Sequence, residues 1–178
     1  GGLDIQRHFP NEELIRFMGS NFFVAPVKQR KDIHILEVGC GSCANLWMLA
    51  REGFNAHGID LLEESIHLGE KKLEHWGVRA ELRVGSMKEL PYENESLDAV
   101  LDVFAAYCLD EEVFHTCLQE VTRVLKPGGI FFSYTPGKAS YDFQHDHQAR
   151  MVEASTLNGI HRKGSPFNSN HYPFRFLH

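Results

Sequence analysis

The sequence predicts an α/β protein whose doubly wound, mostly parallel sheet carries helices on both faces. Short apolar runs of strand length alternate with segments of helical periodicity. The first of these runs ends in a glycine turn that leads directly into a helical segment. Alternating strands and helices favour a parallel sheet, because each helix carries the chain back across the sheet. At 178 residues and 43% hydrophobic content, the chain is long enough to form one domain with a sizeable core.

The first elements are helical and then alternate with strands. Residues 3–24 are predicted to be helical around Asn11–Met18, and Pro26–Asp32 is predicted to be a connector. The apolar run Ile33–Val38 predicts the first strand, buried on both faces. A helix with Leu46, Trp47, Leu49 and Ala50 on its apolar face then continues to Gly53.

The middle of the chain continues the alternation. Asn55–Asp60 is the second strand, and Leu62–Trp76 is a helix that Gly77 closes. Val78–Val84 differs from the other strands, because apolar residues alternate strictly with Arg79, Glu81 and Arg83. This alternation is typical of a half-exposed strand, so we expect it at an edge of the sheet.

Two further strands complete the predicted sheet. Leu97–Phe104 contains a buried-looking run, and the clearest helix, Asp110–Leu125, follows with Asp110 as a plausible N-cap. Lys126–Gly129 (Lys-Pro-Gly-Gly) is expected to stop that helix. Ile130–Thr135 then forms the fifth strand.

Regularity fades after residue 135. We divide the chain into an N-terminal helical segment (1–32), a core (33–135) and a C-terminal segment (136–178) within one domain. The last segment shows one short helix around Gln148–Leu157 and the start of a strand in Tyr172–Leu177. An open edge on the fifth strand would be an aggregation hazard. We therefore expect that the last sheet strands are missing because the chain is truncated, or that a second copy in a homodimer covers the edge.

The composition argues against some classes of binding partner and indicates the cellular compartment. The net charge of −6, without a dense Lys/Arg stripe, argues against nucleic acid as a partner. No apolar stretch approaches the roughly 18 residues of a membrane span, and no pattern marks a signal peptide. The cysteines at 40, 43, 108 and 117 do not resemble a secreted disulfide framework, so a reducing cytoplasm is expected.

The corner between the first strand and the first helix is the strongest functional signal. Gly39-x-Gly41-x-x-Ala44 fits the dinucleotide fingerprint, and Asp60 ends the next strand where an acidic side chain can take ribose hydroxyls. A nicotinamide cofactor is therefore one interpretation. Cys40-x-x-Cys43 at a helix start also resembles a thioredoxin-type redox pair. The plainer alternative is that both cysteines are small residues that fit a tight turn.

A third interpretation explains more of the chain. Five ordered motifs resemble those of the class I S-adenosylmethionine (SAM)-dependent methyltransferases, which have a Rossmann-like fold. They are Glu37-Val-Gly-Cys-Gly-Ser, Gly58-Ile59-Asp60, Gly85-Ser86-Met87 with Leu90-Pro91, Leu97-Asp98-Ala99-Val100-Leu101-Asp102, and Leu125-Lys-Pro-Gly-Gly129. The resemblance covers roughly residues 33–135, and the family's third strand also lies at a sheet edge.

The resemblance implies SAM as cofactor, S-adenosylhomocysteine as product, and roles for the matching positions. Gly39, Cys40, Gly41 and Asn45 would form the cofactor loop, with Glu37 beside the methionine end. Asp60 would bind the ribose hydroxyls, and Leu61, Ser86 and Met87 would contact the adenine. Asp102 and Val103 would face the methionine moiety and the transferring methyl. Acidic strand ends suit the cations of SAM, and helix N–H groups suit its carboxylate. Two positions depart from the family's pattern: a small residue, most often glycine, is usual at Cys43, and aspartate at Ser86.

The acceptor and the base are less defined. Methyl transfer is an in-line displacement, so positioning can supply most of the rate. Asp102, Tyr107, His145 and His147 are candidate bases by position, with a polar or packing role as the alternative for each. His145-Asp146-His147 lacks a paired ligand motif, so we predict no metal site.

The function that the sequence predicts is methyl transfer to the oxygen or nitrogen of a small molecule. Residues 136–178 would bind the acceptor, because their aromatic and histidine content suits a small organic molecule. The Asn/Asp-Pro-Pro-aromatic sequence of many base-modifying methyltransferases does not follow the fourth strand. The alternatives are a catalytically inactive SAM-binding interaction module and an NAD(P)-dependent oxidoreductase.

Overall fold

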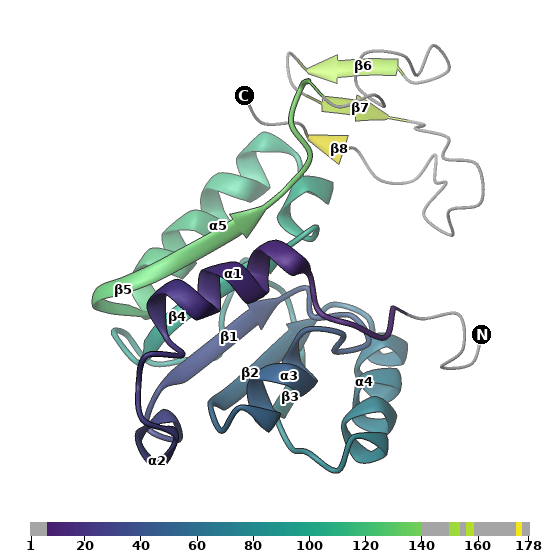
Figure 1. Cartoon of the computed structure of the whole chain (residues 1–178). Helices are drawn as coiled ribbons and strands as arrows, with labels where there is room; N and C mark the ends of the chain where they lie inside the picture. Colours follow the sequence, from purple (N-terminus) through teal and green to yellow (C-terminus); the bar gives the residue numbers. More distant parts are fainter. Residues whose placement is uncertain (1–6, 140–149, 154–155, 159–173, 176–178) are drawn as a thin grey trace.

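A five-stranded parallel sheet in the order β3-β2-β1-β4-β5 forms the centre of the molecule (Figure 1). The computed structural model describes residues 7–139, 150–153, 156–158 and 174–175. The strands of this sheet are β1 (His34–Val38), β2 (Asn55–Asp60), β3 (Glu81–Val84), β4 (Leu97–Val103) and β5 (Leu125–Tyr134). Strand order reverses direction between β1 and β4, which is the place where ligands bind in open α/β sheets.

Helices cover both faces of this sheet, as the sequence predicts (Figure 1). They are α1 (Glu12–Asn21), α2 (Val27–Arg30), α3 (Leu46–Arg51), α4 (Glu63–His75), the 3₁₀ turn η2 (Ala106–Cys108) and α5 (Glu111–Val124). Buried side chains of α1, α3 and α4 pack in one cluster with Ile35 of β1. Those of α5 pack in another with Leu36 of β1. Neighbouring residues of β1 therefore face opposite layers, as in a strand buried on both sides.

The sequence predicted the edge strand and the cap of α5, whereas the cap of α1 was not predicted. β3 lies at one edge of the sheet, and its register pairs it with β2 alone among the described strands. Asp110 caps α5, because its Oδ1 accepts the Val113 N–H at 2.9 Å. Asn11 caps α1 in the same way, through the Leu14 N–H at 3.1 Å. Each cap satisfies a backbone donor that has no partner within the helix.

Three predicted boundaries are wrong. The helix expected over residues 3–24 is shorter, because Asn11 caps α1 and residues 7–11 are not helical. The helix ends before Lys126, as expected, but the fifth strand starts earlier than Ile130, because β5 begins at Leu125 and includes Lys126–Gly129, with a shift of register between Leu97 and Ala99 of β4. Gly128 has a φ of +82° there, which lets the strand bulge and still resume pairing at Ile130. The connector Pro26–Asp32 contains a helical turn, α2, whose Arg30 is buried.

The C-terminal segment also differs from the prediction. The expected helix around Gln148–Leu157 is wrong, because β6 (Arg150–Glu153) and β7 (Thr156–Asn158) pair antiparallel there. Val152 and Thr156 are β-branched, and such residues favour strands. β8 (Phe174–Arg175) completes a separate three-stranded sheet and falls inside the expected strand 172–177. Among the described strands none pairs with the outer side of β5, and the homodimer stays a prediction.

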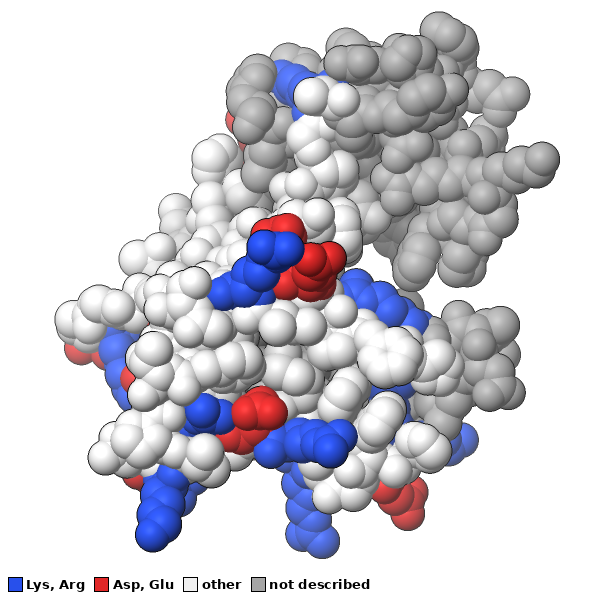
Figure 2. Space-filling model, in the orientation of Figure 1, with Lys and Arg blue, Asp and Glu red and all other residues white. Residues whose placement is uncertain are grey.

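The surface carries charges of both signs. On the face in Figure 2, Lys and Arg are interspersed with Asp and Glu, and the coloured residues form no continuous basic stripe. These mixed charges agree with the net charge of −6. Within the described part of the chain, no helix has the length and apolar character needed to span a membrane.

Candidate cofactor site

The carboxyl ends of β1, β2 and β3 surround a cavity of about 200 Å³. Ten residues line it: Gly39, Ile59, Asp60, Leu61, Gly85, Ser86, Met87, Lys88, Leu109 and Val113. Five of these, Gly39, Asp60, Leu61, Ser86 and Met87, are sequence-predicted cofactor residues. The cavity is mostly apolar but has one carboxylate at its edge, a combination that suits a purine ring and its ribose.

Asp60 is fixed by its own backbone surroundings. Its Oδ2 accepts the Gly41 N–H at 2.8 Å, and its Oδ1 accepts the Leu62 N–H at 3.0 Å. A carboxylate has about four lone-pair positions, so two remain for hydroxyl donors. Because both bonds come from the backbone of flanking loops, the carboxylate is held in one orientation before any ligand binds.

Glu37 is a buried carboxylate at the end of β1. It is 2% exposed, and its Oε1 accepts a hydrogen bond from Asn45 Nδ2 at 2.5 Å. Its Oε2 is buried and has no hydrogen-bond partner among the described residues. Burial raises the pKa of Glu37 to about 8 against the weaker opposing effects of Asn45 and Arg7. An orphaned buried carboxylate oxygen is costly, so this atom suits a cationic ligand group such as an ammonium.

The loop between β1 and α3 approaches the segment after β4 very closely. Gly39 has a φ of +63°, and a Cβ added there would lie 2.3 Å from Cβ of Ala105. Glycine is therefore required at residue 39 by both backbone conformation and space. Gly41 also has a positive φ, of +52°, but a Cβ there would meet nothing within 4 Å.

The two cysteines of this loop are packing residues. Cys40 and Cys43 are free thiols, 5% and 0% exposed. A hydrogen bond with Cys43 and burial both raise the pKa of the Cys40 thiol. A thioredoxin-type nucleophile needs a lowered thiol pKa, so the redox interpretation is not supported. Cys43 stands where the family usually has a small residue, and its φ is +61°. Its thiol lies against Gly69 of α4, where an added Cβ would be 2.5 Å from Sγ of Cys43.

Cys43 and Gly69 are therefore expected to be energetically coupled. Gly69→Ala should destabilise the protein by ~1–2 kcal/mol, because the overlap with the thiol outweighs the helix propensity that alanine gains. In a Cys43→Gly background the same change should become neutral or stabilising. Urea denaturation of the two single variants and the double variant measures the coupling. Additive effects would show that the thiol does not occupy the space beside Gly69.

Asp102 holds the turn after β4. It is fully buried, and its Oδ1 accepts the N–H groups of Ala105 and Ala106 at 3.0 and 2.9 Å. Its Oδ2 accepts Ser133 Oγ of β5 at 2.7 Å. These contacts shape the segment that passes over Gly39. Asp102 is thus arranged as a positioning group, and its oxygens are directed at protein donors.

The remaining described candidates do not line the cavity. Tyr107 of η2 is 7% exposed and Val103 is 8% exposed, and neither lines the cavity. Phe104 has a φ of +59° and stacks edge-on against Tyr134 and Tyr107, with centroids 5.0 and 6.1 Å apart. Asn45 is 4% exposed and contacts Glu37 instead of the cavity. His145 and His147 lie outside the described residues.

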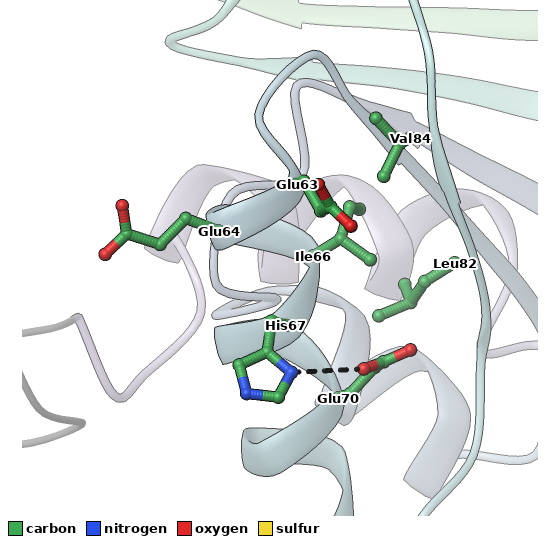
Figure 3. A pocket seen from close by; sticks show the side chains of 7 residues that line it. All are labelled: Glu63, Glu64, Ile66, His67, Glu70, Leu82 and Val84. Carbon is green, nitrogen blue, oxygen red and sulfur yellow. Dashed lines mark ion pairs between the residues drawn. The ribbon is translucent and has the colours of Figure 1, made fainter.

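A larger hollow lies between α4 and β3, and none of the sequence-predicted cofactor residues lines it (Figure 3). It has a volume of about 600 Å³ and is lined by Glu63, Glu64, Ile66, His67, Glu70, Leu82 and Val84. Nδ1 of His67 lies 3.7 Å from Oε2 of Glu70. In the described residues no group of three or more His, Cys, Asp or Glu is placed to hold a metal. The smaller cavity at the strand ends is the candidate site, although it has a third of this volume, because five predicted cofactor residues line it and none lines the larger hollow.

Sequence reasoning missed half of the cavity's lining. Leu109 and Val113 come from the start of α5, and Ile59, Gly85 and Lys88 flank residues that were predicted. The N-cap at Asp110 was a usable signal, because it places the first turn of α5 at the carboxyl end of the sheet.

Comparison with known proteins identifies the family. Residues 35–129, more than half of the chain, match the family described as "Methyltransferase domain". The chain belongs to the class I SAM-dependent methyltransferase family. This membership agrees with the glycine loop, the acidic ends of β1 and β2 and the parallel sheet. No finding supports the oxidoreductase or the inactive binding module.

The chain is similar to two named mycobacterial methyltransferases. A phthiotriol/phenolphthiotriol dimycocerosates methyltransferase from Mycobacterium leprae is 38% identical over 138 residues, covering 71% of this chain and 50% of that protein. A fatty-acid O-methyltransferase from Mycolicibacterium smegmatis is 36% identical over 110 residues, covering 61% and 38%. The chain thus spans half or less of the length of these relatives.

The fold is also found in solved structures. The crystal structure of a SAM-dependent methyltransferase from Methanosarcina mazei superposes with a TM-score of 0.70. The match is 22% identical and covers 86% of this chain and 78% of that one. At this identity the likeness shows the fold, which is the doubly wound α/β sheet that the sequence predicts.

Proposed function

We propose that the protein is a cytoplasmic methyltransferase that transfers the methyl group of SAM to an oxygen or nitrogen of a small molecule. The observation that carries this proposal is the pairing of Asp60, at the edge of an apolar cavity, with Glu37, whose buried Oε2 lacks a partner. Asp60 would take the ribose hydroxyls and Glu37 the ammonium of the cofactor. Four free cysteines are consistent with a reducing compartment.

The chemistry needs positioning more than acid–base groups. When bound, the cofactor supplies an electrophilic methyl carbon; the acceptor atom bonds to it as the C–S bond breaks, the electron pair stays on sulfur, and the acceptor's proton leaves to water or a base. Gly39, Asp60 and Glu37 would fix the two ends of the cofactor so that the methyl is presented in line. Asp102 would act by shaping the turn after β4, because protein donors already occupy its oxygens. The structure thus offers positioning residues for the transfer.

The acceptor would be a small, largely apolar molecule. Phe104 and Tyr134 are 39% and 36% exposed beside the ends of β4 and β5, and both offer aromatic surface. The two relatives described above are named for lipid acceptors, which supports this choice of substrate class. We propose that residues 136–178 contribute to acceptor binding; His145, His147 and most of this segment lie outside the described residues. Tyr107 stays a candidate base.

Asp60→Ala is expected to weaken S-adenosylhomocysteine binding by ~10- to 100-fold, because one or two charge-assisted hydrogen bonds are lost. Isothermal titration calorimetry measures the change. Asp32→Ala, at an exposed aspartate ahead of β1, is the matched control and should bind like the wild type. Wild-type affinity in Asp60→Ala would remove Asp60 from the site. No binding by the wild-type protein would refute the proposed function.

A further inference from the structure

Residues 7–11, which we call the N-terminal strap, lie against the glycine loop and are fastened there from three sides. Trp47 Nε1 of α3 donates to the His8 carbonyl at 2.9 Å. Lys72 Nζ of α4, on a side chain 2% exposed, donates to the Arg7 carbonyl. The Asn11 N–H donates to Oδ1 of Asn45 at 2.9 Å. Hydrogen bonds from α3, α4 and the glycine loop thus hold the backbone of the strap, so the strap is fixed beside that loop.

The strap brings a cation to the methionine end of the site. Arg7 Nη2 donates to Asn45 Oδ1 at 3.0 Å, and Nδ2 of the same amide donates to Glu37 Oε1 at 2.5 Å. A guanidinium and a buried carboxylate therefore face each other through one side-chain amide. The positive charge of Arg7 also lowers the pKa of Glu37 against the larger effect of burial.

The amino-acid end of the cofactor needs an anionic and a cationic partner close together. It carries an ammonium and a carboxylate on one carbon, and Glu37 Oε2 suits the ammonium. Several N–H groups of the glycine loop are already used: that of Cys40 by the Ile59 carbonyl, that of Gly41 by Asp60, and that of Cys43 by the Cys40 carbonyl. A guanidinium carries five N–H donors in a planar fork that matches a carboxylate. Arg7 contributes Nε to the Phe9 carbonyl and Nη2 to Asn45, which leaves the fork able to take a further acceptor.

We propose that Arg7 binds the carboxylate of the cofactor's methionine moiety, so that the N-terminal strap forms part of the cofactor site. This inference rests on the proposed function. Lys72 and Trp47 set the position of Arg7 by holding the backbone of residues 7 and 8. The strap residues precede the matched family region 35–129 and were outside the site that the sequence predicts.

The test compares two ligands that differ in the carboxylate alone. Isothermal titration calorimetry with S-adenosylhomocysteine and with its decarboxylated analogue, S-adenosyl-3-thiopropylamine, is carried out on the wild type and on Arg7→Ala. Arg7→Ala should weaken S-adenosylhomocysteine binding by ~10-fold or more and leave binding of the analogue nearly unchanged. Arg7→Lys should keep part of the preference, because it keeps the charge without the fork. Arg16→Ala, at an exposed arginine of α1, is the matched control and should keep the full preference.

Each other outcome has a distinct meaning. Equal weakening of both ligands in Arg7→Ala would overturn the inference, since it would show a general effect on the site. Unchanged affinity for S-adenosylhomocysteine would overturn it as well, while leaving the proposed function intact. Failure of the wild type to bind either ligand would refute the proposed function itself, and the inference with it.

Discussion

Gly39→Ala is expected to destabilise the protein by about 2–5 kcal/mol and to abolish measurable binding of S-adenosylhomocysteine. A left-handed φ costs a residue with a Cβ about 1–2 kcal/mol. The new methyl would also lie 2.3 Å from Cβ of Ala105, and overpacking of this kind costs about 1–3 kcal/mol. Relief of that overlap must move either the cofactor loop or the turn that Asp102 holds. Both movements change the wall of the cavity that Gly39 lines.

Two further variants separate the cost of the backbone conformation at residue 39 from the cost of the overlap with Ala105. Gly77→Ala has a similar φ, +64°, with nothing within 4 Å of the new Cβ, so it should cost only the backbone contribution. The double variant Gly39→Ala/Ala105→Gly removes the overlapping methyl and should recover the difference between Gly39→Ala and Gly77→Ala. Urea denaturation measures stability, and calorimetry measures binding. If Gly39→Ala were no more costly than Gly77→Ala, the close approach of residues 39 and 105 would be wrong.

The sequence alone predicted those features that depend on one residue type at one local position. Asp110 caps a helix, the alternation in Val78–Val84 marks an edge strand, and Asp60 ends a buried strand beside the glycine loop. These features depend on period and on chain neighbours, both of which are visible in the printed sequence. The family resemblance also implied that the third strand lies at a sheet edge, and β3 does; the order of the other four strands was not predicted.

Contacts between distant residues explain what the sequence did not reveal. Asp102 looked like a catalytic candidate at a strand end, but its partners Ala105, Ala106 and Ser133 are set by the fold. Lys-Pro-Gly-Gly does follow the end of the helix, as predicted, but pairing with β4 also makes these residues part of β5. Pairing across a sheet overrides local propensity in such cases. The strap likewise depends on Lys72, 65 residues further along the chain from Arg7.

Glu37→Gln is expected to stabilise the ligand-free protein above pH 8 and to weaken cofactor binding. The pKa of Glu37 is about 8 in the folded protein because the carboxyl is buried, against an ordinary value of 4.5. Between these values the unfolded chain loses its proton while the folded protein keeps it, so the free energy of unfolding falls as pH rises. The full difference amounts to ~5 kcal/mol at about 1.4 kcal/mol per pKa unit. An amide nitrogen in place of Oε2 still lacks a partner, so the net gain above pH 8 should be ~2–4 kcal/mol.

Urea denaturation from pH 4.5 to 8.5 tests the first half of this prediction. The wild type should lose stability across the range, Glu37→Gln should lose less, and Glu64→Gln, at an exposed glutamate of α4, should follow the wild type. Parallel slopes in wild type and Glu37→Gln would mean that Glu37 is ionised in the folded protein. The buried carboxyl would then need a partner that the structure does not show.

Cofactor binding tests the second half of the prediction. The Glu37 carboxylate, which destabilises the ligand-free protein, should also hold the bound ligand. An ammonium beside Oε2 favours the ionised form, so S-adenosylhomocysteine should bind with release of up to about one proton at pH 7. Calorimetry in buffers of different ionisation enthalpy measures that proton. Glu37→Gln should release none and bind ~10-fold or more weakly. A variant that is both more stable and a weaker binder would identify Glu37 as a residue kept for binding at a cost to the fold, whereas wild-type proton release in Glu37→Gln would assign the proton to another group.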